Sequence, residues 1–338
     1  MWRVRPAQLD DLQLILEIAI AQNARLSSTL PEQETTLAER IQHSVESLRG
    51  SNPKSQPKRV LFVLENTDTG QIAGTAGIDT RAGNGHPFYN YRRDNLIHAS
   101  HELNVSRRVE VLYPSHALTD LSLLCAYSLA PELRDTEVAE LLSRARMLFM
   151  AEHRDWFTSK TVVELQGIQH DNGAVPFWDS LGRHFFNMDF ETADLHSGQL
   201  SKTFIAELMP PNPIYVTLLS DEAQEALGQP HPLTAANHER LQREGFQPGS
   251  YVDIFDGGPV LEVRTDTLKT LVTSQIKTLH ATERDDGEAA LIAAGSGERF
   301  RCVLSPMADA LGEDIHVPLA TWHALGAGAS DRVRTAPV

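Results

Sequence analysis

A strand followed by a helix start, within residues 119–150, is the part of the sequence best suited to hold an anionic ligand. Residues 121–129 form an almost uninterrupted apolar run, which predicts a strand buried on both faces. From Val138 onward, apolar residues recur at the spacing of one helical face. Free amides and the helix dipole at such a start favour a phosphate. Thr136 or Asp135 can cap these amides.

The loop between this strand and helix, residues 134–139, reads Arg-Asp-Thr-Glu-Val-Ala. It resembles the pyrophosphate loop of acyl-CoA N-acyltransferases, Gln/Arg-x-x-Gly-x-Gly/Ala, in Arg134 and in the small last residue, Ala139. The first glycine of that pattern is Glu137 here. Its carboxylate would stabilise the free helix start by roughly 0.3–1 kcal/mol and would therefore compete with a bound phosphate.

Composition places the chain among ordinary globular proteins. It has 338 residues, 41% of them hydrophobic and 22% charged, enough for a large domain and a smaller one. The formal net charge of −15 argues against nucleic acid and anionic membranes as partners, and an anionic cofactor would need a local basic pocket. We expect a cytoplasmic protein without a membrane span or signal peptide. Cys125 and Cys302 are expected to be reduced core thiols.

The remaining chain supplies elements on either side of this unit. Strands are predicted at residues 60–65 and 72–78, joined by a hairpin turn, and at residues 161–165. Residues 79–118 are poorly periodic and rich in His, Tyr, Arg and Asn, and connections of this length tend to be functional or to hide short strands. From residue 260, short segments alternate with turns, which predicts a small β-rich subdomain over 260–338 with a helix at 319–325.

Short motifs, in order over roughly residues 1–265, resemble the arginine/ornithine N-succinyltransferase family. The matching stretches are Val63-Leu64-Glu65, Tyr89-Asn90-Tyr91-Arg92, His98-Ala99-Ser100, Glu102-Leu103-Asn104, Leu148-Phe149-Met150-Ala151, Pro176-Phe177-Trp178, Leu181-Gly182, Ala206-Glu207-Leu208-Met209-Pro210, Pro213-Ile214-Tyr215, Gly228-Gln229-Pro230-His231-Pro232 and residues 251–259. The C-terminal segment and the glycine-poor loop look like those of the alpha-subunit type.

This resemblance implies an α/β, mixed-sheet fold of the acetyltransferase-like acyl-CoA N-acyltransferases. Residues 1–259 would form that domain, with a family-specific helical extension from about residue 196, followed by the β-rich subdomain. The implied reaction transfers succinyl from succinyl-CoA, a co-substrate, to the α-amine of arginine or ornithine by direct amine attack, in arginine catabolism. No permanently bound cofactor is expected. A homo-oligomer, or a hetero-oligomer with a homologous beta-type subunit, is expected.

A second hypothesis comes from a different class. In it the chain is a non-catalytic or regulatory alpha-type subunit that shapes an oligomer with an active homologue. Glu137 in place of the loop glycine favours this hypothesis, whereas His231 favours the enzyme. A covalent acyl-enzyme is not expected, since Cys125 lies inside a strand and no Ser-His-Asp motif is visible.

The resemblance assigns roles at three positions near the cofactor. His231, in a loop between two prolines, would be the proton donor; imidazole titrates near neutral pH, although a loop histidine can also simply fix its turn. Tyr127 would contact succinyl-CoA or be a core aromatic. Arg134 would neutralise a cofactor phosphate, or would belong with Arg144 and Arg146 to a solvated basic helix face.

A polar and aromatic cluster is predicted to bind an amino acid that carries both a carboxylate and a guanidinium. Arg92 could pair with a carboxylate of the succinyl group or of the amino acid. Glu164 and Glu207 are candidates for the guanidinium or the α-amine. No metal site is expected. The candidate substrate-binding residues are Tyr89, Asn90, Arg92, His98, Ser100 and Glu164.

Overall fold

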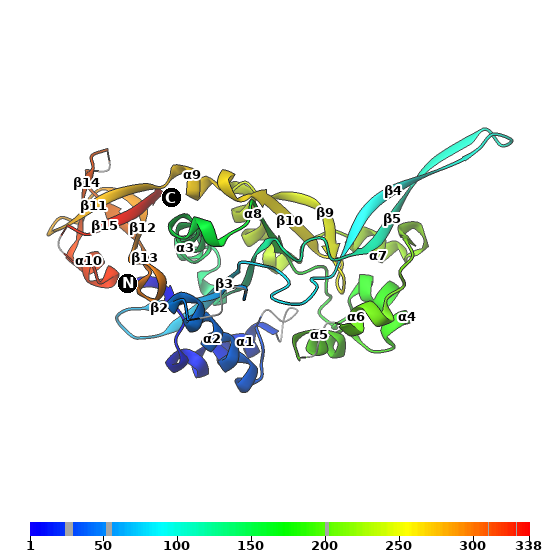
Figure 1. Cartoon of the computed structure of the whole chain (residues 1–338), viewed down its shortest axis with the longest axis horizontal. Helices are drawn as coiled ribbons and strands as arrows, with labels where there is room; N and C mark the ends of the chain where they lie inside the picture. Colours follow the sequence, from blue (N-terminus) through cyan, green and yellow to red (C-terminus); the bar gives the residue numbers. More distant parts are fainter. Residues whose placement is uncertain (24–29, 52–55, 200–202, 310, 329) are drawn as a thin grey trace.

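A computed structural model describes residues 1–23, 30–51, 56–199, 203–309, 311–328 and 330–338. Its strands form one mixed sheet of fifteen in the order β14-β11-β15-β12-β13-β1-β2-β3-β6-β7-β10-β9-β4-β5-β8. Figure 1 shows the whole chain with most of its elements labelled. The strands are β1 (Trp2–Pro6), β2 (Arg59–Asn66), β3 (Ile72–Asp79), β4 (Asn90–Ser100), β5 (Val105–Ser115), β6 (Ser122–Leu129), β7 (Lys160–Glu164), β8 (Ile214–Tyr215), β9 (Gln247–Asp253), β10 (Pro259–Arg264), β11 (Gln275–Thr282), β12 (Glu288–Ala294), β13 (Arg301–Met307), β14 (Asp314–Pro318) and β15 (Arg332–Pro337). The α-helices are α1 (Leu12–Asn23), α2 (Glu34–Arg49), α3 (Glu137–Glu152), α4 (Arg183–Phe186), α5 (Phe190–Gln199), α6 (Thr203–Leu208), α7 (Asp221–Ala226), α8 (Ala235–Arg243), α9 (Lys269–Thr273) and α10 (Leu319–Leu325).

Helices cover both faces of the central strands, as the continuous apolar run in β2 requires. Alternate side chains of a strand point to opposite faces. Phe62 and Leu64 therefore join the core beneath α3, whereas Leu61 and Val63 pack with α1 and α2. Because both faces are buried, the sheet is fixed in position between the two helical layers.

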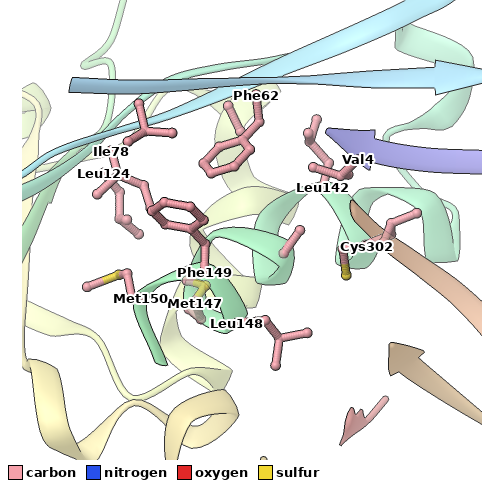
Figure 2. Packing of buried hydrophobic residues seen from close by; sticks show 14 of the residues in the cluster. Val4, Phe62, Ile78, Leu124, Leu142, Met147, Leu148, Phe149, Met150 and Cys302 are labelled. Atoms are coloured by element: carbon pink, nitrogen blue, oxygen red, sulfur yellow. The ribbon is translucent and has the colours of Figure 1, made fainter. Parts of the chain in front are cut away.

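Helix α3 is the centre of the larger core. Its Phe149 is fully buried and meets Phe62 edge to face at 5.2 Å between ring centroids (Figure 2). The Phe149 ring also meets the ring of Phe300 at 5.3 Å. Phe300 precedes β13, so one aromatic side chain joins the N-terminal strands to the C-terminal region. The helix predicted from apolar spacing is confirmed, and its burial holds its N-terminus firmly beside the end of β6.

Strands β6 and β7 run parallel and then part. Their pairing extends from Ser122, opposite Thr161, only as far as Leu124, opposite Val163. Beyond it, Ala126 adopts a left-handed φ of 50°, and the register between β3 and β6 shifts at this point. Such a bulge bends a strand and re-aims its side chains. The parting opens a cleft within a mixed α/β sheet, which confirms the predicted fold class.

Residues 79–118 hold two long strands rather than a loop. β4 and β5 pair without interruption from Asn90, opposite Ser115, to Ser100, opposite Val105. The hairpin projects from the rest of the molecule as an arm (Figure 1). We call residues 90–115 the arm. Most of its residues are exposed, so its polar side chains are spread along its length.

The C-terminal region builds its own core from β11 to β15 and α10, and the helix predicted at residues 319–325 is α10. It joins the rest of the sheet through β13, which pairs with β1. β10 lies between β7 and β9. The division of the chain at residue 259 stays a prediction. Within the described residues, no helix is long and apolar enough to cross a membrane.

Candidate functional site

Two cavities meet where β6 and β7 part. One faces α3 and α8, and its lining includes Arg134, Arg146 and Arg240; we call it the basic cavity. The other faces the base of the arm and α5, and its lining includes Asp194 and Asp256; we call it the acidic cavity. The residues that line both are Leu124, Cys125, Ala126, Glu164, Leu165 and Gln166.

The arginines of the basic cavity come from three separate elements. Arg134 lies in the loop after β6, and its Nε donates to the Leu129 carbonyl at 3.3 Å. Arg240, on α8, donates to the Arg134 carbonyl and pairs with Glu140 at 3.5 Å. An acidic chain thus forms the local basic pocket that an anionic cofactor requires.

The start of α3 is not capped as predicted. The Thr136 hydroxyl donates to the Leu133 carbonyl at 2.8 Å, and it forms no capping hydrogen bond with the amides of the first turn. Glu137 is exposed at this end of the helix, whereas Ala139 is fully buried and packs into the core. Ala139 thus keeps the helix close to the sheet, while any ligand at the helix start would meet the Glu137 carboxylate.

The solvated basic face expected along α3 does not exist. Arg144 is 4% exposed and pairs with buried Glu244 at 2.9 Å. Arg146 is 1% exposed and lies over the ring of Tyr127, with 5.2 Å between Cζ and the ring centroid. Two arginines two residues apart thus point inward from α3. One has a carboxylate partner, and the other lines the basic cavity.

Tyr127 also lines the basic cavity. Its hydroxyl donates to the Ala139 carbonyl at 3.4 Å, and burial raises the pKa of this phenol. The side chain therefore links β6 to α3 beside the cavity. Its contact with succinyl-CoA stays a prediction.

The acidic cavity is lined by four carboxylates from three places in the sequence: Glu164, Asp194, and the turn that holds Asp253 and Asp256. None of the described residues that line it is Lys or Arg. Glu164 ends β7 and accepts a hydrogen bond from Asn90 Nδ2 at 2.5 Å. This arrangement favours a cationic ligand, because a positive charge within a few ångströms of each carboxylate lowers the electrostatic energy.

Asp256 is the most buried of these carboxylates. It accepts hydrogen bonds from the amides of Gly167 at 2.7 Å and Gly258 at 2.8 Å. A Cβ at Gly167 would lie 2.5 Å from the Asp256 carbonyl oxygen, so this approach needs a glycine. Burial, together with the charge of Asp253, raises the pKa of Asp256. Asp256 therefore fixes the floor of the cavity, and among the described residues no cluster of metal ligands accompanies it.

The structure brings only some of the predicted substrate-binding residues to the cleft. Tyr89 and Glu164 line the acidic cavity, and Asn90 holds Glu164 there. Arg92 is exposed on the arm, where it pairs with Asp94 at 3.3 Å.

The other two candidates lie further out. The exposed His98 ring is 5.7 Å from that of Tyr215, and the Ser100 hydroxyl accepts from the Leu103 amide at 3.3 Å near the tip of the arm. Glu207 is exposed on α6. The roles of all these residues stay predictions.

His231 lies beside the cleft without lining either cavity. Its amide donates to the carbonyl of Gln166, a residue of both cavities, at 2.7 Å. Nδ1 accepts from the Leu233 amide at 3.1 Å, and Nε2 lies 3.2 Å from the Gln169 carbonyl. In the neutral ring the proton therefore resides on Nε2. Burial lowers the pKa of His231, so the neutral ring is favoured near pH 7. Its part in proton transfer stays a prediction.

Cys125 departs from the expectation of a core thiol, since it lines both cavities at the bulge. Its Sγ lies 3.3 Å from Arg40 Nη2. Burial raises the pKa of this thiol to about 12, so it remains protonated and is a poor nucleophile. Cys302 is buried in β13 as predicted.

The sequence interpretation missed Arg146, Arg240, Asp194 and Gln166 as members of the site. A signal existed for Arg146, which stands four residues after Leu142 and three before Phe149, on the apolar face of α3. No comparable signal marks Arg240 or Asp194, because folding brings them to the cleft from distant segments.

Comparisons with known proteins cover the whole chain. A family described as "Arginine N-succinyltransferase beta subunit" matches residues 2–270, and one described as its C-terminal domain matches residues 275–337. The arginine N-succinyltransferases of Escherichia coli O139:H28 and of Shigella flexneri are each 40% identical over 336 residues, which is 99% of this chain and 97% of theirs. The structure of arginine/ornithine succinyltransferase subunit AI from Pseudomonas aeruginosa superposes with a TM-score of 0.92 at 34% identity, covering 100% of this chain and 98% of that one.

Proposed function

The chain belongs to the arginine N-succinyltransferase family, and from that premise we propose that it moves a succinyl group from succinyl-CoA to the α-amine of arginine. It is an acyltransferase of the acyl-CoA N-acyltransferase-like fold, as predicted. Succinyl-CoA acts as a co-substrate and not as a resident cofactor.

One observation carries the proposal: two cavities of opposite charge meet at the parted ends of β6 and β7. Succinyl-CoA is strongly anionic and suits the basic cavity, while the free main-chain groups of parting strands suit an extended pantetheine chain. Arginine is cationic at its side chain and suits the acidic cavity. The thioester and the amine then meet beside the residues that line both cavities.

The proposed reaction is a direct transfer. The deprotonated α-amine attacks the thioester carbonyl, a C–N bond forms, the C–S bond breaks, and a proton from the amine ends on the CoA sulfur. His231, hydrogen-bonded through its backbone to Gln166, is proposed to carry that proton after its ring turns from Gln169. The protonated Cys125 takes no part as a nucleophile.

The test uses the purified chain alone with succinyl-CoA and arginine, following free thiol and N-succinylated product. Release of one thiol per product molecule is expected. Ornithine and lysine in place of arginine then measure how the acidic cavity selects its amine. Thiol release only after a homologous subunit is added would instead favour the non-catalytic subunit hypothesis.

We also propose that the chain assembles in the cytoplasm with a second copy, or with a homologous beta-type subunit, through its arm. At its outer end Ile97 is 69% exposed and Leu103 75% exposed. A two-stranded hairpin is marginally stable alone in water, and apolar residues at its end favour a partner surface. Residues 90–115 contain four Arg and three Asp or Glu, so the arm has a small positive charge. The rest of the chain is more negative than −15, so the charge of the arm does not oppose its contact with a second copy.

Light scattering of the purified chain tests this assembly. Replacing Ile97 and Leu103 by Lys is expected to lower the native mass to that of one chain. Val272→Lys, an exposed apolar position on α9, serves as the control and should leave the mass unchanged. An unaltered mass in the arm variant, with or without a homologous subunit present, would contradict the role of the arm.

A further inference from the structure

We propose that the Arg146 guanidinium binds the terminal carboxylate of the succinyl group and thereby selects succinyl-CoA among acyl-CoA thioesters. The inference rests on the proposed function, because it names the part of that substrate which one buried side chain would recognise. It replaces exposed Arg92, which pairs with Asp94 on the arm, as the candidate for this carboxylate.

The first argument is the missing partner of Arg146. Its Nε donates to the Ser143 carbonyl at 3.1 Å and its Nη2 to the Ser143 hydroxyl at 3.2 Å. Among the described residues it forms no ion pair, although it is 1% exposed. A buried charge without a counter-charge is costly, and burial lowers the pKa of this guanidinium to about 10. It still carries its charge near neutral pH.

Arg144, two residues earlier, shows what a structural arginine on this helix looks like. Its Nε donates to Thr270 Oγ1 at 2.8 Å and lies 2.9 Å from Glu244 Oε1, and its Nη2 donates to the Pro337 carbonyl at 2.7 Å. Two of the three nitrogens of that guanidinium thus have partners in the protein, one of them a carboxylate. Arg146 has equal burial but lines a cavity, so a ligand can supply the anion that the protein does not.

The second argument is position along α3. Arg146 is nine residues beyond Glu137, which places it about 13 Å deeper than the helix start at a rise of about 1.5 Å per residue. A pyrophosphate held at the helix start would therefore lie too far away to contact it. The phosphates are left to Arg134 and Arg240, beside the loop.

The third argument is the neighbourhood of the guanidinium. It lies over the ring of Tyr127, one residue after the bulge at Ala126. Its charge also acts on the Cys125 thiol, one residue before the bulge. The bulge is where the strands part and the cavities meet, so the acyl end of the cofactor belongs there. Arginine suits a carboxylate because its N–H donors match the two oxygens.

The experiment compares succinyl-CoA with butyryl-CoA, which has the same chain length without the carboxylate. The wild-type chain is expected to prefer succinyl-CoA by about 100-fold in kcat/KM. Arg146→Met should lose most of that preference by weakening succinyl-CoA alone, while free CoA binds as before. Arg146→Lys should keep part of the preference, since it keeps the charge but not the paired donors.

Arg144→Lys is the matched control: it should lower the thermal stability and leave the preference unchanged. Equal losses for succinyl-CoA, butyryl-CoA and free CoA in Arg146→Met would overturn the inference, and so would an unchanged preference. If Arg146→Met does not fold, an unchanged preference in Arg146→Lys decides against it. A wild-type chain that releases no thiol with arginine would refute the proposed function instead.

Discussion

The two cavities at the parted strands share six lining residues, yet they carry opposite charge. The acidic cavity follows the composition of the chain, in which Asp and Glu outnumber Lys and Arg by 45 to 30. The basic cavity opposes it and needs arginines from a loop, from α3 and from α8. The excess of acidic residues therefore suits the cationic acceptor, while the anionic cofactor depends on a few placed arginines.

Replacement of His231 tests whether the two cavities work as one site. His231→Gln should lower kcat by about 100-fold or more, because proton transfer by a placed side chain contributes at least that much. Burial lowers the pKa of His231, so the wild-type rate should fall as pH drops through a value below the usual 6.5 or so, where the imidazole becomes charged.

The pH profile of kcat/KM for the variant should lack that acidic limb. His170→Gln, at an exposed histidine that contacts Glu222, is the control and should keep both the rate and the limb. Turnover unchanged in His231→Gln would remove this histidine from the chemistry and leave the two cavities without a common proton carrier.

A second substitution, at a carboxylate that lines both cavities, should weaken the binding of arginine more than the binding of CoA. Glu164→Gln removes a carboxylate that would face the cationic substrate, and loss of one charge-assisted hydrogen bond costs about 2 kcal/mol. The KM for arginine should rise about 30-fold while the dissociation constant for CoA changes less than about twofold. Glu207→Gln, at an exposed carboxylate on α6, is the control. A similar loss for both substrates would mean that the cavities do not divide them.

The reverse substitution should impair the basic cavity alone. Arg240→Met removes a guanidinium that lines the cavity and holds the Arg134 carbonyl. We expect about tenfold weaker CoA binding by calorimetry and an unchanged KM for arginine. Its neighbour Arg243 also pairs with Glu140 but is exposed, so Arg243→Met is a matched control with little effect. Equal effects of the two variants would show that Arg240 acts only through Glu140.

The smallest effect concerns the carboxylate at the start of α3. Glu137→Gly should tighten CoA binding about threefold, because a charge at a helix start is worth roughly 0.3–1 kcal/mol. Glu137→Gln removes the charge without adding glycine and should give a similar gain, which shrinks at high salt. Calorimetry in low and high salt measures both. Weaker or equal binding would show that the ligand does not meet this carboxylate.

Local patterns predicted the parts of the fold whose signals lie within one element. The buried strand at β6 and the helix α3 were predictable because apolar spacing reports burial directly. The arm was not, since its outer part is exposed on both faces and therefore shows no alternation. From the sequence, its polar residues were predicted to form one substrate-binding cluster. Polar side chains that are close in sequence need not meet in space, and here they are spread along the arm.

The site could be predicted only in part, for a related reason. The loop at Arg134 and the carboxylate of Glu164 lie in elements that the sequence indicates. Arg240 and Asp194 reach the cleft through contacts between distant segments, which no local pattern encodes. Arg146 was taken for a surface residue because its charge outweighed its place on an apolar face. A charged residue at a core position of a helix thus indicates a buried side chain that can belong to a site, although its charge alone suggests the surface.

The pairing of β1 with β13 constrains the order in which the strands of the sheet can pair during synthesis. Arg3 lies opposite Val303, so β1 pairs on that side with a strand that is synthesised much later in the chain. On its other side β1 needs only β2, which follows within some sixty residues. Pairing of β1 with β2 can therefore form early, but the middle of the sheet is completed only after β13 has been synthesised, and contacts this distant slow folding. Until then the free edge of β1 can pair with other chains.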